Sequence, residues 1–200
     1  MRIKTFLAPA IACLLLAACV PVKTSTITGK LALVSQPAMR WDHRPEADEW
    51  TNRALAAVAR HDAELAATVP ADIEAWCPGY ATASVQNRRA FWVGALSAVA
   101  KYESSWNPAA VGGGGKYIGV LQISPKSAAH HNCTASSAKA LKDGAANLEC
   151  GVEIMATQVG RDGVVAGKGN RGIGRDWMPF RKAANRAAMS EWTRNQSYCQ

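Results

Sequence analysis

One acidic side chain stands in the most distinctive stretch of this chain, residues 102–108, which read Tyr-Glu-Ser-Ser-Trp-Asn-Pro. The acid, Glu103, ends an apolar run with helical spacing and is followed by four glycines at 112–115. An apolar strip then covers 119–124 and carries a single amide, Gln122. This order of residues can place one carboxylic acid in a sheltered groove, where it can protonate the leaving oxygen of a glycosidic bond.

The surroundings of Glu103 predict a raised pKa for its carboxyl group. The C-terminal end of a helix carries partial negative charge, and the neighbours Tyr102 and Trp106 are apolar; both disfavour a carboxylate. A general acid that works near neutral pH needs such a pKa. No Asp or Glu lies between Glu103 and Asp143, so no second carboxylate is evident nearby, although ordinary glycosidases use two.

The elements that must position Glu103 are helical. Apolar residues recur at spacings of three and four over 84–102, which predicts a helix with a broad apolar stripe. The pair Ser124-Pro125 predicts a helix start, and Asp143 predicts the cap of another helix. Further helices are expected over about 48–67 and 180–194. Alternating patterns are rare, so we expect a mostly α fold with little or no β-sheet.

The N-terminus predicts export. The apolar run 6–16 is too short to span a membrane, which takes roughly twenty residues, and is typical of a signal peptide. The sequence Leu-Ala-Ala-Cys at 16–19 resembles the bacterial lipobox, which implies a signal peptide of residues 1–18 and a lipid anchor on Cys19. The alternative is an ordinary signal peptide with an incidental cysteine. Val20 favours sorting to the outer membrane, facing the periplasm.

The rest of the chain divides into a tether and a folded part. Residues 19–45 are rich in Thr, Ser, Pro and Lys without a sustained period, which predicts a flexible tether. We expect an N-terminal helical segment over 46–69 and one catalytic domain over 70–200. Without the signal peptide the chain has 21 basic and 15 acidic residues, a net charge of +6, which suits an envelope with anionic polymers. The basic residues are scattered, and export also argues against a nucleic-acid partner.

Four cysteines remain beyond the signal peptide and the expected anchor. An even number in an oxidising compartment predicts two disulfides, and three pairings are possible. We favour Cys133–Cys150, which closes a short loop, and Cys77–Cys199, which joins the start of the domain to its end. A zinc site is the alternative, but no two of these cysteines have CxxC spacing. We expect no metal and no cofactor.

One glycine motif has a more ordinary explanation than nucleotide binding. Residues 167–172 match GxGxxG, but no suitable strand precedes them and no helix follows directly. We interpret this segment as a basic loop that borders the groove.

Two motifs in order give a family resemblance. Glu103-Ser104, followed by Asn107-Pro108 and then Gly-Val-Leu-Gln-Ile at 119–123, resembles the Glu-Ser and Gly-Leu-Met-Gln motifs of the soluble lytic transglycosylase domain. Residues 147–152 resemble a later helix of that family. The resemblance covers about 88–160 and implies a lysozyme-like, mostly α domain that cleaves peptidoglycan.

The resemblance also implies a role for the acid. Glu103 would be the sole catalytic acid and base. It would protonate the oxygen between N-acetylmuramic acid and N-acetylglucosamine, and then accept the proton of the muramic 6-hydroxyl, leaving a 1,6-anhydro end. The expected substrate contacts are Ser104, Leu121, Gln122, Trp106 and Trp177. The first three belong to the two motifs, and Trp177 stands where the family has a tyrosine.

Two alternatives stay open at this point. A hydrolytic muramidase of the goose type shares the fold and adds water in place of the 6-hydroxyl. A non-catalytic peptidoglycan-binding lipoprotein would use the groove without the acid. In each case the expected partners are peptidoglycan strands and, through Cys19, a membrane; the protein is expected to be a monomer.

Overall fold

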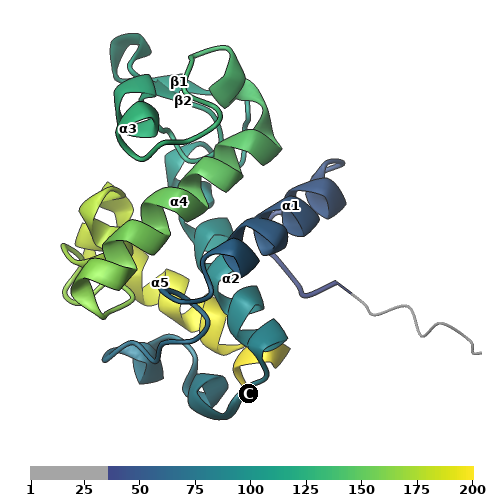
Figure 1. Ribbon diagram of the computed structural model, residues 1–200, viewed down its shortest axis with the longest axis vertical. Helices are drawn as coiled ribbons and strands as arrows, with labels where there is room; N and C mark the ends of the chain where they lie inside the picture. The colour runs from purple at the N-terminus through teal and green to yellow at the C-terminus, as the bar shows by residue number, and fades with distance from the viewer. Residues whose placement is uncertain (1–35) are drawn as a thin grey trace, which may run out of the picture. The chain divides into compact units, whose positions relative to one another are not determined.

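The structure of the protein, a computed structural model, describes residues 36–200 (Figure 1). The expected signal peptide, the anchor at Cys19 and the first part of the tether lie outside the described residues. The described helices are α1 (Ala47–Arg60), α2 (Val85–Glu103), α3 (Pro125–His130), α4 (Gly144–Asp162) and α5 (Ala183–Arg194).

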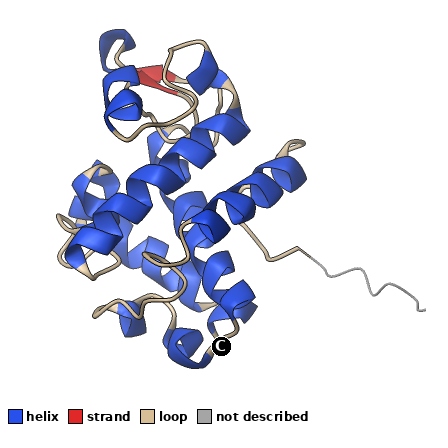
Figure 2. Cartoon of the chain, in the orientation of Figure 1, coloured by secondary structure: helices blue, strands red, loops and turns tan. Residues whose placement is uncertain are grey.

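The only sheet among residues 36–200 is small, as Figure 2 shows. It pairs β1 (Val111–Gly112) with β2 (Tyr117–Ile118) in antiparallel register. The prediction of a mostly α, lysozyme-like fold with little sheet is confirmed. In Figure 1 the hairpin and α3 lie at one end of the molecule, and α5 and the C-terminus lie toward the other.

Side-chain caps begin three of the helices. Ser84 before α2, Ser124 before α3 and Asp143 before α4 each accept a hydrogen bond from the backbone N–H three residues later, at 3.2, 3.0 and 2.9 Å. These caps satisfy donors that a helix start leaves free, which is worth about 1 kcal/mol each. The predicted starts at Ser124 and Asp143 are confirmed.

Helix α2 is the buried axis of the fold. Every residue from Ala90 to Ala100 is buried, and α2 packs against both α1 and α5. Gly94 allows the C-terminal turn (Ser197–Cys199) to approach α2 closely, because a Cβ there would lie 2.2 Å from the hydroxyl oxygen of Tyr198. Enclosed packing on all sides fixes the direction of α2, and therefore the place where its last residue, Glu103, emerges.

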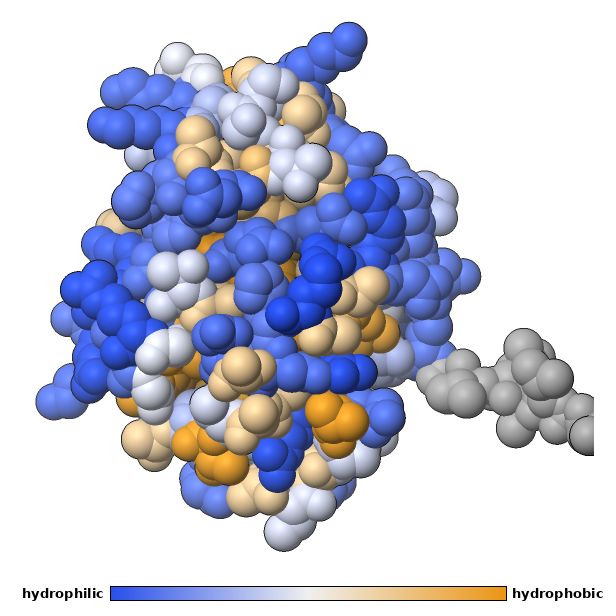
Figure 3. All heavy atoms as spheres, viewed as in Figure 1, coloured by the Kyte–Doolittle hydropathy of each residue, from blue (hydrophilic) through white to orange (hydrophobic). Residues whose placement is uncertain are grey.

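Two disulfides and an apolar interior complete the core. The structure contains Cys77–Cys199 and Cys133–Cys150, the pairing favoured from the sequence. The face drawn in Figure 3 is mainly hydrophilic, with apolar atoms in small separate groups. No described helix has the length and apolar character that crossing a membrane requires.

The N-terminal boundaries differ from those expected. Residues 36–45, assigned to the tether, pack onto the fold: Trp41 is fully buried, donates its indole N–H to Thr51 and meets the edge of Trp50 at 5.9 Å. Helix α1 contacts α2 and α4, so residues 36–200 lie in one compact unit with no division at residue 70. A polar composition hid the few apolar anchors, Met39 and Trp41, that bind this segment to the core.

Candidate active site

Glu103 lies in a groove of about 330 Å³ at the end of α2, here called the Glu103 groove. Burial raises the pKa of Glu103 to about 7, which confirms the expected direction. Within residues 36–200 its carboxyl group has no hydrogen bond or ion pair that would hold the ionised form. The other lining residues come from the same helix end and from the segment that leads into α5: Tyr102, Met178, Pro179, Lys182 and Asn185.

Ser104 fixes the end of α2 against the apolar strip. Its hydroxyl donates to the carbonyl of Val120 at 2.7 Å and accepts from the N–H of Asn107 at 3.1 Å. Both bonds are to backbone, so the structure shows Ser104 in a positioning role. The carboxyl group of Glu103 is thus followed directly by a hydroxyl group that anchors the helix end.

The backbone reverses directly after Ser104. Ser105 and Trp106 have φ values of 53° and 58°, in the left-handed region, which ends α2 at Glu103. The indole of Trp106 folds back, donates to the carbonyl of Ser97 at 2.9 Å and meets the His43 ring at 4.7 Å. Trp106 is not among the residues that line the Glu103 groove, and its sugar contact stays a prediction.

The amide of Gln122 holds the hairpin that follows the site. Its side-chain N–H₂ donates to the carbonyls of Gly119 and Ala110, at 3.0 and 3.3 Å. A Cβ on Gly112 would lie 2.3 Å from the amide oxygen of Gln122, which explains why a glycine stands where the chain enters the loop. Gln122 therefore holds the hairpin together; it is not among the residues that line the Glu103 groove, and its sugar contact stays a prediction.

Two residues expected to wall the groove lie in the core instead. Leu121 is fully buried, and its Cδ1 would lie 2.2 Å from a Cβ on Gly151 of α4. Trp177 is 3% exposed and donates its indole N–H to the carbonyl of Leu121 at 2.9 Å. Neither side chain is among those that line the Glu103 groove, and their sugar contacts stay predictions.

The comparison with protein families decides the assignment. The family model described as the transglycosylase SLT domain matches residues 82–189, more than half of the chain. The chain belongs to the SLT domain family. The match contains Glu103, the apolar strip and most of α5, and the family acts on peptidoglycan as its substrate.

Solved structures agree with this assignment. The SLT chain is similar to three structures of Bd0314 DslA: two variants with different single Glu-to-Gln substitutions, and the wild-type protein. Each is 27% identical to this chain, covers 83% of it over 100% of its own length, and superposes with a TM-score of 0.73 or 0.74. No curated protein matches the chain.

The sequence analysis missed one buried residue that orders this SLT site. Asn147, fully buried in α4, accepts the N–H of Leu121 at 2.9 Å and donates to the carbonyls of Ile118 and Leu141, at 3.0 and 2.9 Å. It thereby pairs the N–H of Leu121 and the carbonyl of Leu141, and adds a second bond to the carbonyl of Ile118, which also accepts the N–H of Ile123. The resemblance at 147–152 contained Asn147, but the pattern alone did not reveal its partners.

The residues that face Glu103 across the groove were also missed. Met178 is 60% exposed in a 3-10 turn (Met178–Arg181), and Lys182 and Asn185 come from the start of α5. Among the described residues, the side chains of Lys182 and Asn185 have no hydrogen bond or ion pair. No sequence pattern marked these residues, because a 3-10 turn precedes α5 and the helix begins at Ala183 and not at about 180.

Two carboxylates shape the segment that carries this wall. Asp162 accepts from Arg175 and from the backbone N–H of Gly172, and the Arg175 guanidinium holds the pKa of Asp162 down at about 2. Asp72 accepts the backbone N–H groups of Val165, Ala166 and Gly167. The GxGxxG segment is thus a loop held by side-chain anchors.

Proposed function

We propose that the protein is a lytic transglycosylase that cleaves the β-1,4 bond between N-acetylmuramic acid and N-acetylglucosamine. The observation that carries this proposal is a single carboxyl group, Glu103, half-buried in a groove and with a pKa of about 7. No other Asp or Glu is among the residues that line the Glu103 groove. One group must then serve as both acid and base.

The reaction needs two proton transfers at Glu103. In the first, the carboxylic acid gives its proton to the glycosidic oxygen as the bond from that oxygen to C1 of the muramic sugar breaks. In the second, the carboxylate takes the proton of the 6-hydroxyl of the same sugar as its oxygen bonds to C1. The products are a 1,6-anhydro end and a free 4-hydroxyl, and Glu103 ends protonated as it began. A pKa near the working pH suits a group that must do both.

The test is product analysis on purified sacculi. The parent protein should release muropeptides with 1,6-anhydro ends, and Glu103→Gln should lower the rate by about 10²–10⁴-fold because the amide cannot transfer the proton. Reducing ends in place of anhydro ends would identify a hydrolytic muramidase. Equal lysis by Glu103→Gln and the parent would show that Glu103 is not the catalytic acid, and no lysis by the parent would favour a non-catalytic binding protein.

We also propose that the domain is held at the outer membrane through a lipid on Cys19, facing the periplasm. The lipobox-like sequence supports this location, as do two disulfides, which form in oxidising compartments. Replacing Cys19 with Ser should move the protein from the membrane fraction to the soluble fraction, while Cys13→Ser, inside the signal peptide, should leave the fractionation unchanged.

A further inference from the structure

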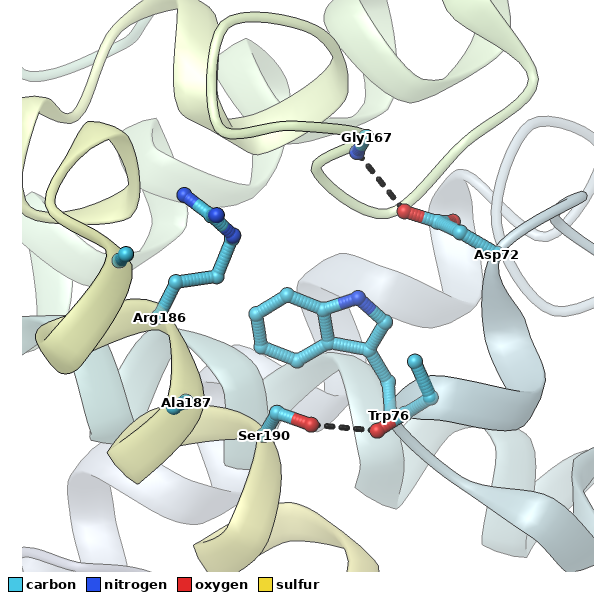
Figure 4. Close-up of a pocket in the computed structure, with 8 residues that line it drawn as sticks. Asp72, Trp76, Gly167, Arg186, Ala187 and Ser190 are labelled. Carbon is cyan, nitrogen blue, oxygen red and sulfur yellow. Dashed lines mark hydrogen bonds between the residues drawn. The ribbon is translucent and has the colours of Figure 1, made fainter.

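A second cavity of about 220 Å³ lies beside the first turns of α5, on a different face from the Glu103 groove. Lys182 and Asn185 border the groove, whereas residues 183, 186, 187 and 190 share the neighbouring face by their spacing. We call this second site the Arg186 cavity. Figure 4 labels six of the residues that line it: Asp72, Trp76, Gly167, Arg186, Ala187 and Ser190.

Opposite charges face this cavity without pairing. Figure 4 shows Asp72 and Arg186 on different sides of the Trp76 indole, and among the ion pairs of residues 36–200 none joins the two. An unpaired acid and base around one small cavity can bind a ligand that carries both charges.

Each charged group keeps free hydrogen-bonding capacity. The guanidinium of Arg186 donates to the carbonyl of Phe180 at 2.8 Å, which uses one of its five N–H groups. One oxygen of Asp72 accepts two backbone N–H groups, and the other accepts only that of Val165 at 2.6 Å. A carboxylate oxygen has two acceptor sites, so the second oxygen can still accept a bond from a ligand.

The remaining lining is apolar and small. The indole of Trp76 stands between the two charged side chains in Figure 4, and alanines at 183 and 187 leave open space beside it. The hydroxyl of Ser190 is already used, because it donates to the carbonyl of Ala75. The cavity therefore offers one cation, one anion and a short apolar contact.

We propose that the Arg186 cavity binds the zwitterionic end of an amino acid. The ligand carboxylate would accept from Arg186, its ammonium would donate to Asp72, and its carbon chain would lie against Trp76. Peptidoglycan stem peptides carry such an end on a diamino acid, and this choice of source rests on the proposed function. The cavity would then hold the peptide of a strand whose sugar lies at Glu103, across the first turn of α5.

Calorimetric titration with two matched peptides tests the proposal. One is L-alanyl-γ-D-glutamyl-meso-diaminopimelate; the other has L-lysine as third residue, which keeps the side-chain ammonium but lacks its carboxylate. The first should bind at least about tenfold more tightly, since a charge-assisted bond to Arg186 is lost in the second. Equal affinities, or no binding of either peptide, would overturn the assignment.

Two variants locate the binding. Arg186→Gln removes the cation, and Ala187→Leu fills the cavity while leaving the bond from Arg186 to Phe180; each should weaken the diaminopimelate peptide by about tenfold. Arg194→Gln, at the far end of the same helix, is the control and should bind as the parent does. Undiminished binding by Ala187→Leu would place the peptide elsewhere.

The same titration separates this proposal from the catalytic one. The tripeptides have no glycosidic bond, and Glu103→Gln should bind them with the affinity of the parent. If sacculi are not cleaved but the tripeptide binds, only the proposed function fails. If cleavage occurs and both peptides bind equally, only the Arg186 cavity assignment fails.

Discussion

The hydroxyl of Ser104 donates a hydrogen bond to the carbonyl of Val120 at 2.7 Å. This bond joins the end of the buried helix α2 to the apolar strip, which is itself held by Asn147 of α4 through the N–H of Leu121. Glu103 is therefore fixed from both sides, by the helix before it and by the bond directly after it.

Replacing Ser104 with Ala should weaken this fixation. The carbonyl of Val120 and the N–H of Asn107 lose a partner, which should cost about 1–2 kcal/mol in the free energy of unfolding. Activity on sacculi should fall by about tenfold or more, because a misplaced acid loses catalysis steeply. Urea unfolding measures the change in stability, and a turbidity assay on sacculi measures the change in activity.

Ser136→Ala, at an exposed loop position, is the control and should change neither quantity. A Ser104→Ala protein with an unchanged rate would show that this bond does not position the acid.

Glu103 should also make the fold less stable as pH rises from acidic to neutral. Its carboxyl group has a pKa of about 7 in the folded protein, against an ordinary value of 4.5. Between these values the folded state holds more protons than the unfolded state, so stability falls as pH rises from 4.5 to 7, and the loss is complete above 7. Allowing for partial exposure, the loss is about 1–2 kcal/mol.

Glu103→Gln removes this loss. Relative to the parent, the variant should gain about 1–2 kcal/mol of unfolding free energy between pH 5 and pH 8, measured by urea titration. The exposed Glu74→Gln serves as the control and should show no such gain. A constant difference between Glu103→Gln and the parent at both pH values would contradict the raised pKa.

The pH dependence of catalysis should report the same group. The first proton transfer needs protonated Glu103 in the free protein, so kcat/KM should fall about tenfold per pH unit once pH exceeds about 7. Initial rates on soluble glycan strands between pH 5 and 9 measure this fall in kcat/KM. If kcat/KM instead fell around pH 4.5, the ordinary pKa of a Glu carboxyl group, Glu103 in the free protein would not be buried as the structure shows.

Local chemistry made part of this structure predictable. Capping side chains such as Ser124 and Asp143 act within three residues, and the run that became α2 showed its apolar stripe directly. The acid was found because its neighbours, the glycine loop and the strip are all close in sequence. The two disulfides followed from an even count and from the loop each would close.

Long-range packing was not predictable from the same patterns. A tryptophan such as Trp177 can either stack on a sugar or pack in the protein core, and its sequence neighbours do not decide between the two. In the structure its indole N–H bonds to the carbonyl of Leu121, 56 positions away. Lys182 and Asn185 reach the Glu103 groove because a 3-10 turn, rather than a helix, precedes α5. Trp41 lay hidden in a polar segment because its partners, Thr51 and Trp50, lie in the next helix.

The pair of Asp162 and Arg175 should stabilise the segment that carries the far wall of the groove. The side chain of Asp162 is 6% exposed, and Arg175→Gln would leave this carboxylate without its main partner. Arg175→Gln should therefore lower the free energy of unfolding at pH 7, which urea titration measures.

A second arginine provides the matched control for this prediction. Arg161 lies 3.9 Å from the same carboxylate but is 63% exposed, so Arg161→Gln should cost less than about 0.5 kcal/mol. The Arg175 bond depresses the pKa of Asp162 to about 2, so its contribution is present above the ordinary value of 3.8 and is lost as pH falls toward 2. The difference in unfolding free energy between Arg175→Gln and the parent should therefore shrink between pH 5 and pH 3. Equal costs for the two arginine variants at pH 7 would show that Asp162 does not depend on Arg175.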